Sequence, residues 1–320
     1  MHYYFVDVLR CIATILITNS HYNAIWPVAA FATGGSLGNT LFFAISGFCL
    51  SNTQNTDFVR WMKNRILRIY PAVWIVTVIE FVFLTPSIHS IRDCITYFIY
   101  PTQFWFVSAI MLFYGLFYII DKYLAKFVDR IIIANGIFYL FVYIFVVDKN
   151  TWSIEGAGFF KWIFYFEVML IAYSYKKGVL HFSEVMPFKA SIRLFIVLVV
   201  YFGFKFVISM SSILLKFQFI VHLVSIVFLK TSFEWGFSLE SFLKKRKDEL
   251  WFKGLSRIGK ITLEIYLVQT FLIRAFCGYV FPLNLIVVTI SILVCAEALH
   301  YLVILFLSRL KGKKGNEVSD

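Results

Sequence analysis

Charged residues are scarce in this sequence, and their scarcity excludes an ordinary soluble domain. Asp, Glu, Lys and Arg make up 15% of the 320 residues, apolar residues make up 60%, and the mean hydropathy is +0.80. A soluble domain contains about 25% charged residues. The net charge of +12 does not indicate nucleic-acid binding, because the basic residues are spread over many connections between apolar segments. The composition is that of an integral membrane protein.

Motifs for metal ions and for nucleotide phosphates are also missing. The five cysteines lack the spacing of metal ligands, so no metal site is expected. The stretch FATGGSLGNTLFFAISGFCLS is rich in glycine, but it lacks the GxxxxGK[ST] pattern of a phosphate-binding loop and the strand that precedes one. We interpret its glycines as a turn into an apolar segment, where Ser46 and Gly47 allow another helix to approach closely.

Apolar runs of membrane-spanning length predict an all-α fold, a polytopic bundle of about ten transmembrane helices. We expect a single transmembrane domain over residues 1–310 and a polar tail at 311–320. The expected spans are residues 4–25, 36–53, 66–86, 103–121, 130–148, 158–175, 190–209, 213–230, 258–278 and 283–308.

Lys and Arg concentrate on alternate connections, while the opposite set contains little beyond Arg92 and Lys149. By the positive-inside rule, both termini and the basic connections are predicted to be cytoplasmic, which describes a multi-pass protein of the cytoplasmic (inner) membrane. The stretch ESFLKKRKDELWF predicts an interfacial helix at about 238–253 with a basic face toward anionic lipid headgroups.

Ionisable residues inside apolar runs are costly unless they are paired or functional. Asp7 and Arg10 are three residues apart, a spacing that allows an intrahelical ion pair. In a straight helix, His21 returns to within about 20° of Arg10 but lies about 16 Å further along the axis. The two side chains would therefore line one groove at two depths without touching.

Three further features leave alternatives open. Glu264 fits either a structural partner for a basic residue such as Arg10 or a site residue. Glu297 and His300 are expected to form a local hydrogen bond, because they are three residues apart. The stretch RWMKNRILRIYP is either a topogenic signal or a phosphate clamp, for which bidentate Arg is well suited.

Three spaced blocks resemble the opening of the membrane-bound acyltransferase-3 family, in the O-acetyltransferase-like branch that acts on surface polysaccharides. The blocks are VDVLRCIATILITNSH, SLGNTLFFAISGF and RWMKNRILRIYP, with weaker similarity in FWFVSAIMLFY and IGKITLEIYLVQ. The matching residues are Arg10, His21, Phe42, Phe43, Ser46, Gly47, Phe48, Arg65, Arg68 and Pro71.

The resemblance implies transfer of an acyl group, usually acetyl from acetyl-CoA, to a hydroxyl of a cell-surface or lipid-linked glycan. It assigns Arg10 and His21 as the essential catalytic pair and Arg65 with Arg68 as the acyl-donor motif. Trp105 matches an aromatic of the family, and we group it with the donor site. Acetyl-CoA is then a cosubstrate, and no bound cofactor is expected.

The chemistry agrees with the residues found. A neutral histidine can take the proton of an attacking hydroxyl, so His21 is the expected base. Arg10 or the Ser46 region would stabilise the oxyanion, or Arg10 would instead hold the pantetheine arm or pair with Asp7 or Glu264. Gln269 stands where family members often have His, which leaves a second histidine role open.

A transporter or flippase of a sugar or anionic substrate is the alternative function. Ten spans with buried Arg, His and Glu would serve transport equally well by hydropathy alone. Transporters tend to show repeated halves with broken helices in matching positions, and the sequence shows neither feature.

Overall fold

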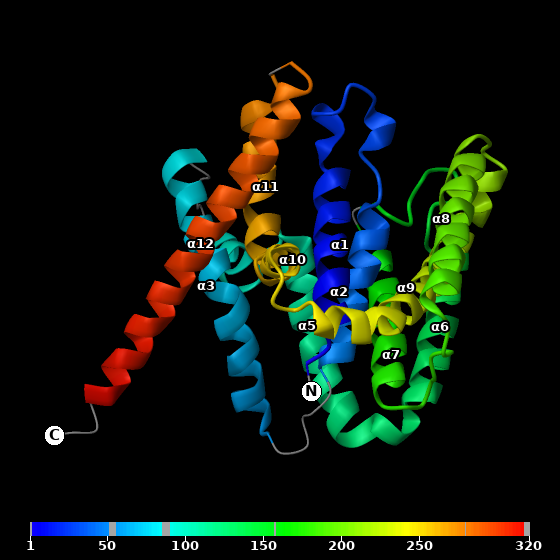
Figure 1. Ribbon diagram of the computed structural model, residues 1–320, viewed down its shortest axis with the longest axis horizontal. Helices are drawn as coiled ribbons and strands as arrows, with labels where there is room; N and C mark the ends of the chain where they lie inside the picture. Colours follow the sequence, from blue (N-terminus) through cyan, green and yellow to red (C-terminus); the bar gives the residue numbers. More distant parts are fainter. Residues whose placement is uncertain (1, 51–55, 85–89, 157, 279, 317–320) are drawn as a thin grey trace. The chain divides into compact units, whose positions relative to one another are not determined.

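The computed structural model describes residues 2–50, 56–84, 90–156, 158–278 and 280–316 (Figure 1). Helices dominate these residues and no strand occurs among them, which confirms the all-α prediction. The α-helices are α1 (Tyr4–Ser20), α2 (Gly35–Cys49), α3 (Phe58–Leu84), α4 (Ile91–Cys94), α5 (Trp105–Ile119), α6 (Val128–Phe145), α7 (Phe160–Lys176), α8 (Pro187–Ser209), α9 (Phe219–Lys245), α10 (Leu250–Lys260), α11 (Thr262–Phe276) and α12 (Leu283–Asn316).

Five helical stretches among the described residues are long and apolar enough to cross a membrane, so the predicted count of about ten is not confirmed. They are Phe58–Phe83, Trp105–Phe145, Pro187–Ser209, Leu214–Lys245 and Leu283–Arg309. A span needs about 20 residues, whereas α1, α2, α7 and α11 contain 17, 15, 17 and 15 residues. The apolar runs of the sequence extend into the turns beside these helices, and hydropathy does not mark where a helix ends.

The surface of α8 has the character of a lipid-facing helix. Phe188, Phe195, Phe206 and Val199 are all more than half exposed, at 76%, 66%, 64% and 55%. Such a row of exposed large apolar side chains is unfavourable in water and favourable in hydrocarbon. Together with the apolar stretches above, it describes a multi-pass membrane protein.

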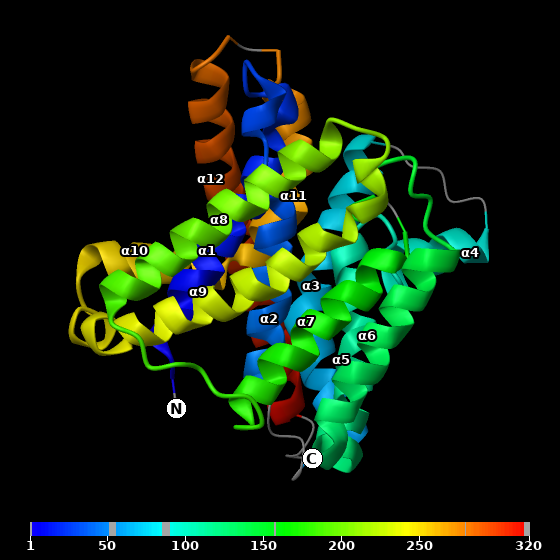
Figure 2. The same ribbon diagram turned by 90° about the vertical axis from the view of Figure 1, so that its right-hand side faces the viewer.

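The described residues form two compact units, and the single domain over 1–310 stays a prediction. The first unit consists of Met1–Ile17, Gly34–Asn52 and Ile119–Gly259, and the second consists of Thr18–Thr33, Thr53–Tyr118 and Lys260–Asp320. In the first unit α2 packs on α7 and α8 packs on α9, and Figure 2 shows the second pair running side by side. In the second unit α11 packs on α12, and both contact α3.

Close helix packing in the first unit depends on glycine. A Cβ at Gly47 of α2 would lie 2.3 Å from the carbonyl oxygen of Met169 on α7, a distance at which the helices would have to separate. Nearby, the rings of Phe43 and Tyr165 stack with their centroids 4.8 Å apart. The expected close approach at Gly47 is therefore present.

The predicted interfacial helix at about 238–253 is not one element. Helix α9 continues to Lys245, a turn follows, and α10 begins at Leu250. The amide of Glu249 donates to the carbonyl of Arg246 within this turn, and Arg246 Nη1 lies 3.2 Å from Glu249 Oε1. The amphipathic character predicted for 238–253 belongs to α10, which starts twelve residues later than expected.

Candidate active site

His21 lies immediately after α1, not within it. The helix ends at Ser20, and the His21 amide donates to the carbonyl of Thr18 in a tighter turn, with φ −90° and ψ −5°. The shared face that we derived for Arg10 and His21 assumed an α-helix through residue 21, whereas His21 lies in the turn that follows α1. Arg10 also belongs to the first compact unit and His21 to the second.

The segment that follows α1 is held in place by side-chain hydrogen bonds within the second unit. Asn19 Nδ2 donates to the carbonyls of Phe31 and Thr33, at 2.8 and 3.0 Å. Trp26 Nε1 donates to Asn19 Oδ1 at 2.9 Å. Asn284 Nδ2 donates to the carbonyl of Ile25 at 2.9 Å, which ties the segment to α12. These bonds fix the chain on both sides of His21.

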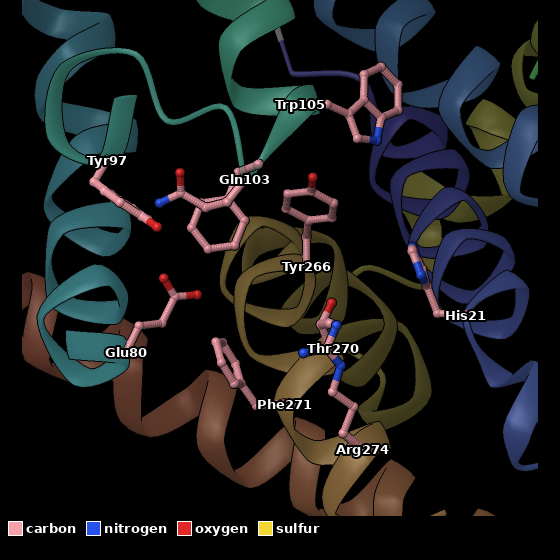
Figure 3. A pocket seen from close by; sticks show the side chains of 10 residues that line it. His21, Glu80, Tyr97, Gln103, Trp105, Tyr266, Thr270, Phe271 and Arg274 are labelled. Atoms are coloured by element: carbon pink, nitrogen blue, oxygen red, sulfur yellow. The ribbon is translucent and has the colours of Figure 1, made fainter. Parts of the chain in front are cut away.

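His21 lines a cavity of about 340 Å³ in the second unit (Figure 3). The volume is at the lower end of the range for small-molecule sites. Both aromatic and polar side chains line it. The lining residues are His21, Glu80, Tyr97, Gln103, Phe104, Trp105, Tyr266, Thr270, Phe271 and Arg274.

One side of the cavity is polar. Glu80, Tyr97 and Gln103 come from three segments and point toward one another in Figure 3. Glu80 is on α3, Tyr97 is in the π-helix Ile95–Ile99, and Gln103 is in the turn before α5. The structure gives Glu80 no ion-pair partner among the described residues. A carboxylate in this position can accept hydrogen bonds from a ligand.

The π-helix that presents Tyr97 is anchored to α3. Trp74 Nε1 donates to the carbonyl of Phe98 at 2.9 Å, and the Tyr70 hydroxyl donates to the carbonyl of Ile99. The rings of Phe81 and Phe98 also stack, with their centroids 5.7 Å apart. Glu80 and Tyr97 are therefore positioned by the same pair of packed elements.

Helix α11 contributes a row of residues to the cavity. Tyr266, Thr270 and Arg274 are four residues apart and so lie on one helical face. The Tyr266 ring also packs against Phe106 of α5, with centroids 5.7 Å apart. In Figure 3, Arg274 lies beside Thr270, and no carboxylate partner for Arg274 occurs within the described part of the chain.

Gln269, next to Thr270 on α11, is fully buried. Neither its amide nitrogen nor its amide oxygen has a hydrogen-bond partner among the described residues. A buried polar group left without a partner costs about 1–3 kcal/mol. The Gln269 amide is therefore available for a hydrogen bond, although Gln269 itself is not among the residues that line the cavity.

The predicted donor residues do not come together. Trp105 lines the cavity with His21, whereas Arg65 and Arg68 do not. Arg65 precedes Glu80 by fifteen residues on the same helix, a rise of about 22 Å. Its guanidinium carbon lies 4.8 Å from the ring centroid of Trp61, and its buried Nε has no partner among the described residues. Arg68 is exposed.

Arg10 has its closest acidic neighbour on its own helix. Its Nη1 lies 3.9 Å from Asp7 Oδ1, so the expected pair is present. Asp7 is buried, accepts a hydrogen bond from Ser256 Oγ at 3.1 Å and lies 3.1 Å from His2 Nε2. The Ser46 hydroxyl donates to the carbonyl of Phe42 within α2.

Glu264 has a structural partner in the second unit. Its Oε1 lies 2.7 Å from Nδ1 of His300, so the contact joins α11 to α12. The sequence predicted a local hydrogen bond between His300 and Glu297. For Glu264 it left two roles open, a structural partner for a basic residue such as Arg10 or a site residue. The pair is partly buried and stabilises the packing of two helices.

Most of the cavity lining was not predicted from the sequence. Glu80, Tyr97, Gln103, Thr270 and Arg274 were not selected as site residues. The four-residue spacing of Tyr266, Thr270 and Arg274 is a signal that would have found the α11 face. No short-range pattern connects Tyr97 and Gln103 to Glu80, because they meet only through the packing of the π-helix on α3.

Comparison with known proteins identifies the family. Residues 3–308 match the family model described as an acyltransferase domain. The chain is similar to the peptidoglycan O-acetyltransferase OatA of Listeria monocytogenes, with 34% identity over 118 residues, which cover 32% of this chain and 18% of that protein. It is also similar to the O-acetyltransferase OatA of Staphylococcus aureus, with 32% identity over 116 residues and the same coverage.

The alignments span less than a fifth of the length of these curated relatives. No solved structure matches the chain. The family model, in contrast, extends over nearly the whole sequence, and its first residues include the blocks around Arg10, His21 and Arg65. The chain therefore belongs to the membrane-bound acyltransferase-3 family.

Proposed function

We propose that this protein is an integral-membrane O-acetyltransferase that moves an acetyl group from acetyl-CoA to a hydroxyl of a cell-surface or lipid-linked glycan. The observation that carries the proposal is the cavity that combines His21 with aromatic rings and polar side chains. The protein would lie in the cytoplasmic membrane with both termini in the cytoplasm. The family match gives no support to the alternative of a transporter or flippase.

The acceptor sugar would bind in this cavity. Sugars present apolar C–H faces and polar hydroxyl rims, and the lining offers the rings of Trp105 and Tyr266 together with the polar groups of Glu80 and Gln103. A volume of about 340 Å³ suits one sugar ring and the acetyl end of the donor, and leaves the nucleotide of acetyl-CoA outside.

His21 would act as the general base. One ring nitrogen takes the proton of the acceptor hydroxyl while the oxygen attacks the thioester carbonyl carbon. The tetrahedral intermediate then collapses, the carbon–sulfur bond breaks, and the thiolate of coenzyme A leaves with the proton returned by the imidazolium. Gln269, whose amide has no partner among the described residues, is a candidate donor to the oxyanion. Arg10, which the family motif pairs with His21, would also be essential for the transfer.

Arg65 and Arg68 would bind the donor's phosphates on the part of α3 that lies about 18–22 Å from Glu80. This separation suits acetyl-CoA, because its phosphates and its thioester are at opposite ends of an extended arm. Trp105, which we grouped with the donor, is better placed to contact the acetyl end or the sugar, since it lies in the cavity.

The proposal is tested with the purified protein in lipid nanodiscs, radiolabelled acetyl-CoA and a cell-envelope glycan fraction. Wild-type protein is expected to transfer label to the glycan. His21→Ala and His21→Gln are expected to lose about 10²–10⁴-fold in rate, the usual contribution of a general base.

His181→Ala is the matched control, because His181 is an exposed histidine of the first unit, outside the cavity. Its rate should equal that of the wild type. Full activity of both His21 variants would remove His21 as the base, and absence of label transfer by the wild type would refute the proposed reaction.

A further inference from the structure

Helix α10 has two contrasting faces, and the outer face is both apolar and basic. Leu250 and Trp251 are 86% and 46% exposed, and Lys253 is exposed one turn further along. The segment from Lys244 to Lys260 contains seven basic residues and two acidic ones. Exposed Leu and Trp beside a run of lysines are typical of helices that lie in the interface of a bilayer.

The inner face of α10 contacts the segment of α1 that contains Asp7 and Arg10. Ser256 is buried, and its hydroxyl donates to Asp7 Oδ2 at 3.1 Å. Gly259 packs so closely that a Cβ would lie 3.1 Å from the Asp7 carbonyl oxygen and 3.5 Å from Arg10 Cβ. The ring of Phe252 also meets that of Tyr4, with centroids 5.9 Å apart.

These contacts place a single short helix between the molecular surface and the Asp7–Arg10 pair. Asp7 is buried and lies 3.9 Å from Arg10 Nη1, so a displacement of Ser256 changes the surroundings of the acid that neighbours the arginine. Helix α10 has eleven residues and is preceded by a turn at 246–249. An isolated helix of this length is only marginally stable, so contacts on its two faces determine its position.

We propose that an anionic phospholipid surface binds the outer face of α10 and, through Ser256 and Gly259, sets the position of Asp7 and Arg10. The acetyl-transfer activity would then depend on anionic lipid; this part rests on the proposed function. Lipid fits better than a nucleic acid or an acidic soluble protein, because Leu250 and Trp251 need an apolar layer beneath the negative charges. Each lysine close to an anionic leaflet strengthens the attraction about fivefold.

The binding step is tested by hydrogen–deuterium exchange of residues 244–260 in the full-length protein. The protein is placed in nanodiscs of phosphatidylcholine alone or with phosphatidylglycerol. Exchange of this segment is expected to slow at least fivefold in the anionic nanodiscs. Lys247→Gln with Lys253→Gln should abolish the difference. Lys126→Gln with Lys189→Gln, which removes the same charge from exposed sites elsewhere in the first unit, should leave it intact.

The coupling step is tested by activity in the same two nanodiscs. Wild-type transfer is expected to be several-fold faster with phosphatidylglycerol, and Ser256→Ala should lose this response while its α10 segment still shows slower exchange. Equal exchange of wild-type α10 in both lipids would overturn the lipid assignment in favour of a protein partner. An unchanged lipid response of Ser256→Ala would overturn the coupling. Exchange is read without any substrate, so failure of the proposed function alone would not alter that result.

Discussion

Glu80 is the residue whose surroundings most directly indicate a role in acceptor binding. It is half-buried, points toward Tyr97 and Gln103 on the polar side of the cavity, and has no ion-pair partner among the described residues. Glu80→Gln keeps the shape and removes the charge. Because a hydrogen bond to a charged group contributes about 1.5–3 kcal/mol, the KM for the glycan should rise about tenfold to a hundredfold.

The measurement is steady-state kinetics with each substrate varied in turn. The KM for acetyl-CoA should stay unchanged, since Glu80 lies far from Arg65 along α3. Asp129→Asn is the control, because Asp129 is exposed on α6 and does not line the cavity. A rise in the KM for acetyl-CoA alone would assign Glu80 to the donor.

Arg65 and Arg68 can be tested separately because their surroundings differ. Arg65 stacks on Trp61, whereas Arg68 is exposed and its replacement should not disturb packing. Lys preserves the charge that directs topology but lacks the planar fork that binds phosphate with two hydrogen bonds. Arg68→Lys, and more strongly the double Lys variant, should raise the KM for acetyl-CoA about tenfold or more.

Arg60→Lys provides the comparison, since Arg60 is exposed on the same helix and outside the two-arginine motif. It should leave both Michaelis constants at their wild-type values. If the double variant also retains wild-type dependence on acetyl-CoA, these arginines serve only as a topogenic signal, and the donor must bind at another basic connection.

At the scale of elements, the contact of α2 with α7 predicts a stability effect. Gly47→Ala would place a Cβ 2.3 Å from the Met169 carbonyl oxygen, which backbone atoms cannot accommodate without separating the helices. Overpacking of this kind costs about 1–3 kcal/mol. The variant should therefore unfold at a lower temperature than the wild type in the same detergent.

Gly203→Ala separates this steric effect from helix propensity. Gly203 lies on α8, and a Cβ added there would meet no atom of the described residues within 4 Å. Ala should therefore be neutral at this position or raise stability by up to about 1 kcal/mol. Equal melting temperatures for Gly47→Ala and the wild type would contradict the proposed role of the close contact.

The all-α fold and the positions of several helices were predictable from the sequence. Long apolar runs mark segments that are buried in lipid or in the protein, and such segments form helices in a membrane protein. The expected span at 190–209 agrees with α8, and the expected span at 283–308 lies within α12. Helix ends were less predictable: α1 ends at Ser20 and α3 begins at Phe58, eight residues before its apolar run. Local turns decide these boundaries, and hydropathy does not record them.

The candidate site was predictable only where a family motif marked it. His21 and Trp105 were predicted from the motif and both line the cavity, whereas Arg65 and Arg68 do not. Glu80, Tyr97 and Gln103 converge through the packing of the π-helix on α3, and Arg274 enters from α11. The four-residue spacing of Tyr266, Thr270 and Arg274 could have indicated the α11 face. The convergence of the other segments depends on tertiary structure, so no spacing in the sequence indicates it.

At the scale of the whole molecule, the distribution of basic residues predicts which connections face the cytoplasm. The connection after α9 contains Arg246 and Lys247, with further basic residues in the helices on either side, whereas Lys149 is the single basic residue in the sequence of the connection after α6. The Nζ of Lys149 donates to the carbonyl of Ile144 at 2.8 Å. Since Lys and Arg are retained on the cytoplasmic side, the turn at 246–249 should be cytoplasmic and the loop at 148–151 should be external.

Single cysteines at Lys247 and Asn150 test this arrangement, because both positions are exposed. They are introduced after Cys49, Cys94, Cys277 and Cys295, the exposed native cysteines, have been replaced by Ser. A membrane-impermeant maleimide should label Asn150→Cys in intact cells and Lys247→Cys only after permeabilisation. The reverse pattern would invert the predicted topology and place the basic connections, with Arg65 and Arg68, outside the cell. Cytosolic acetyl-CoA could then no longer be the donor.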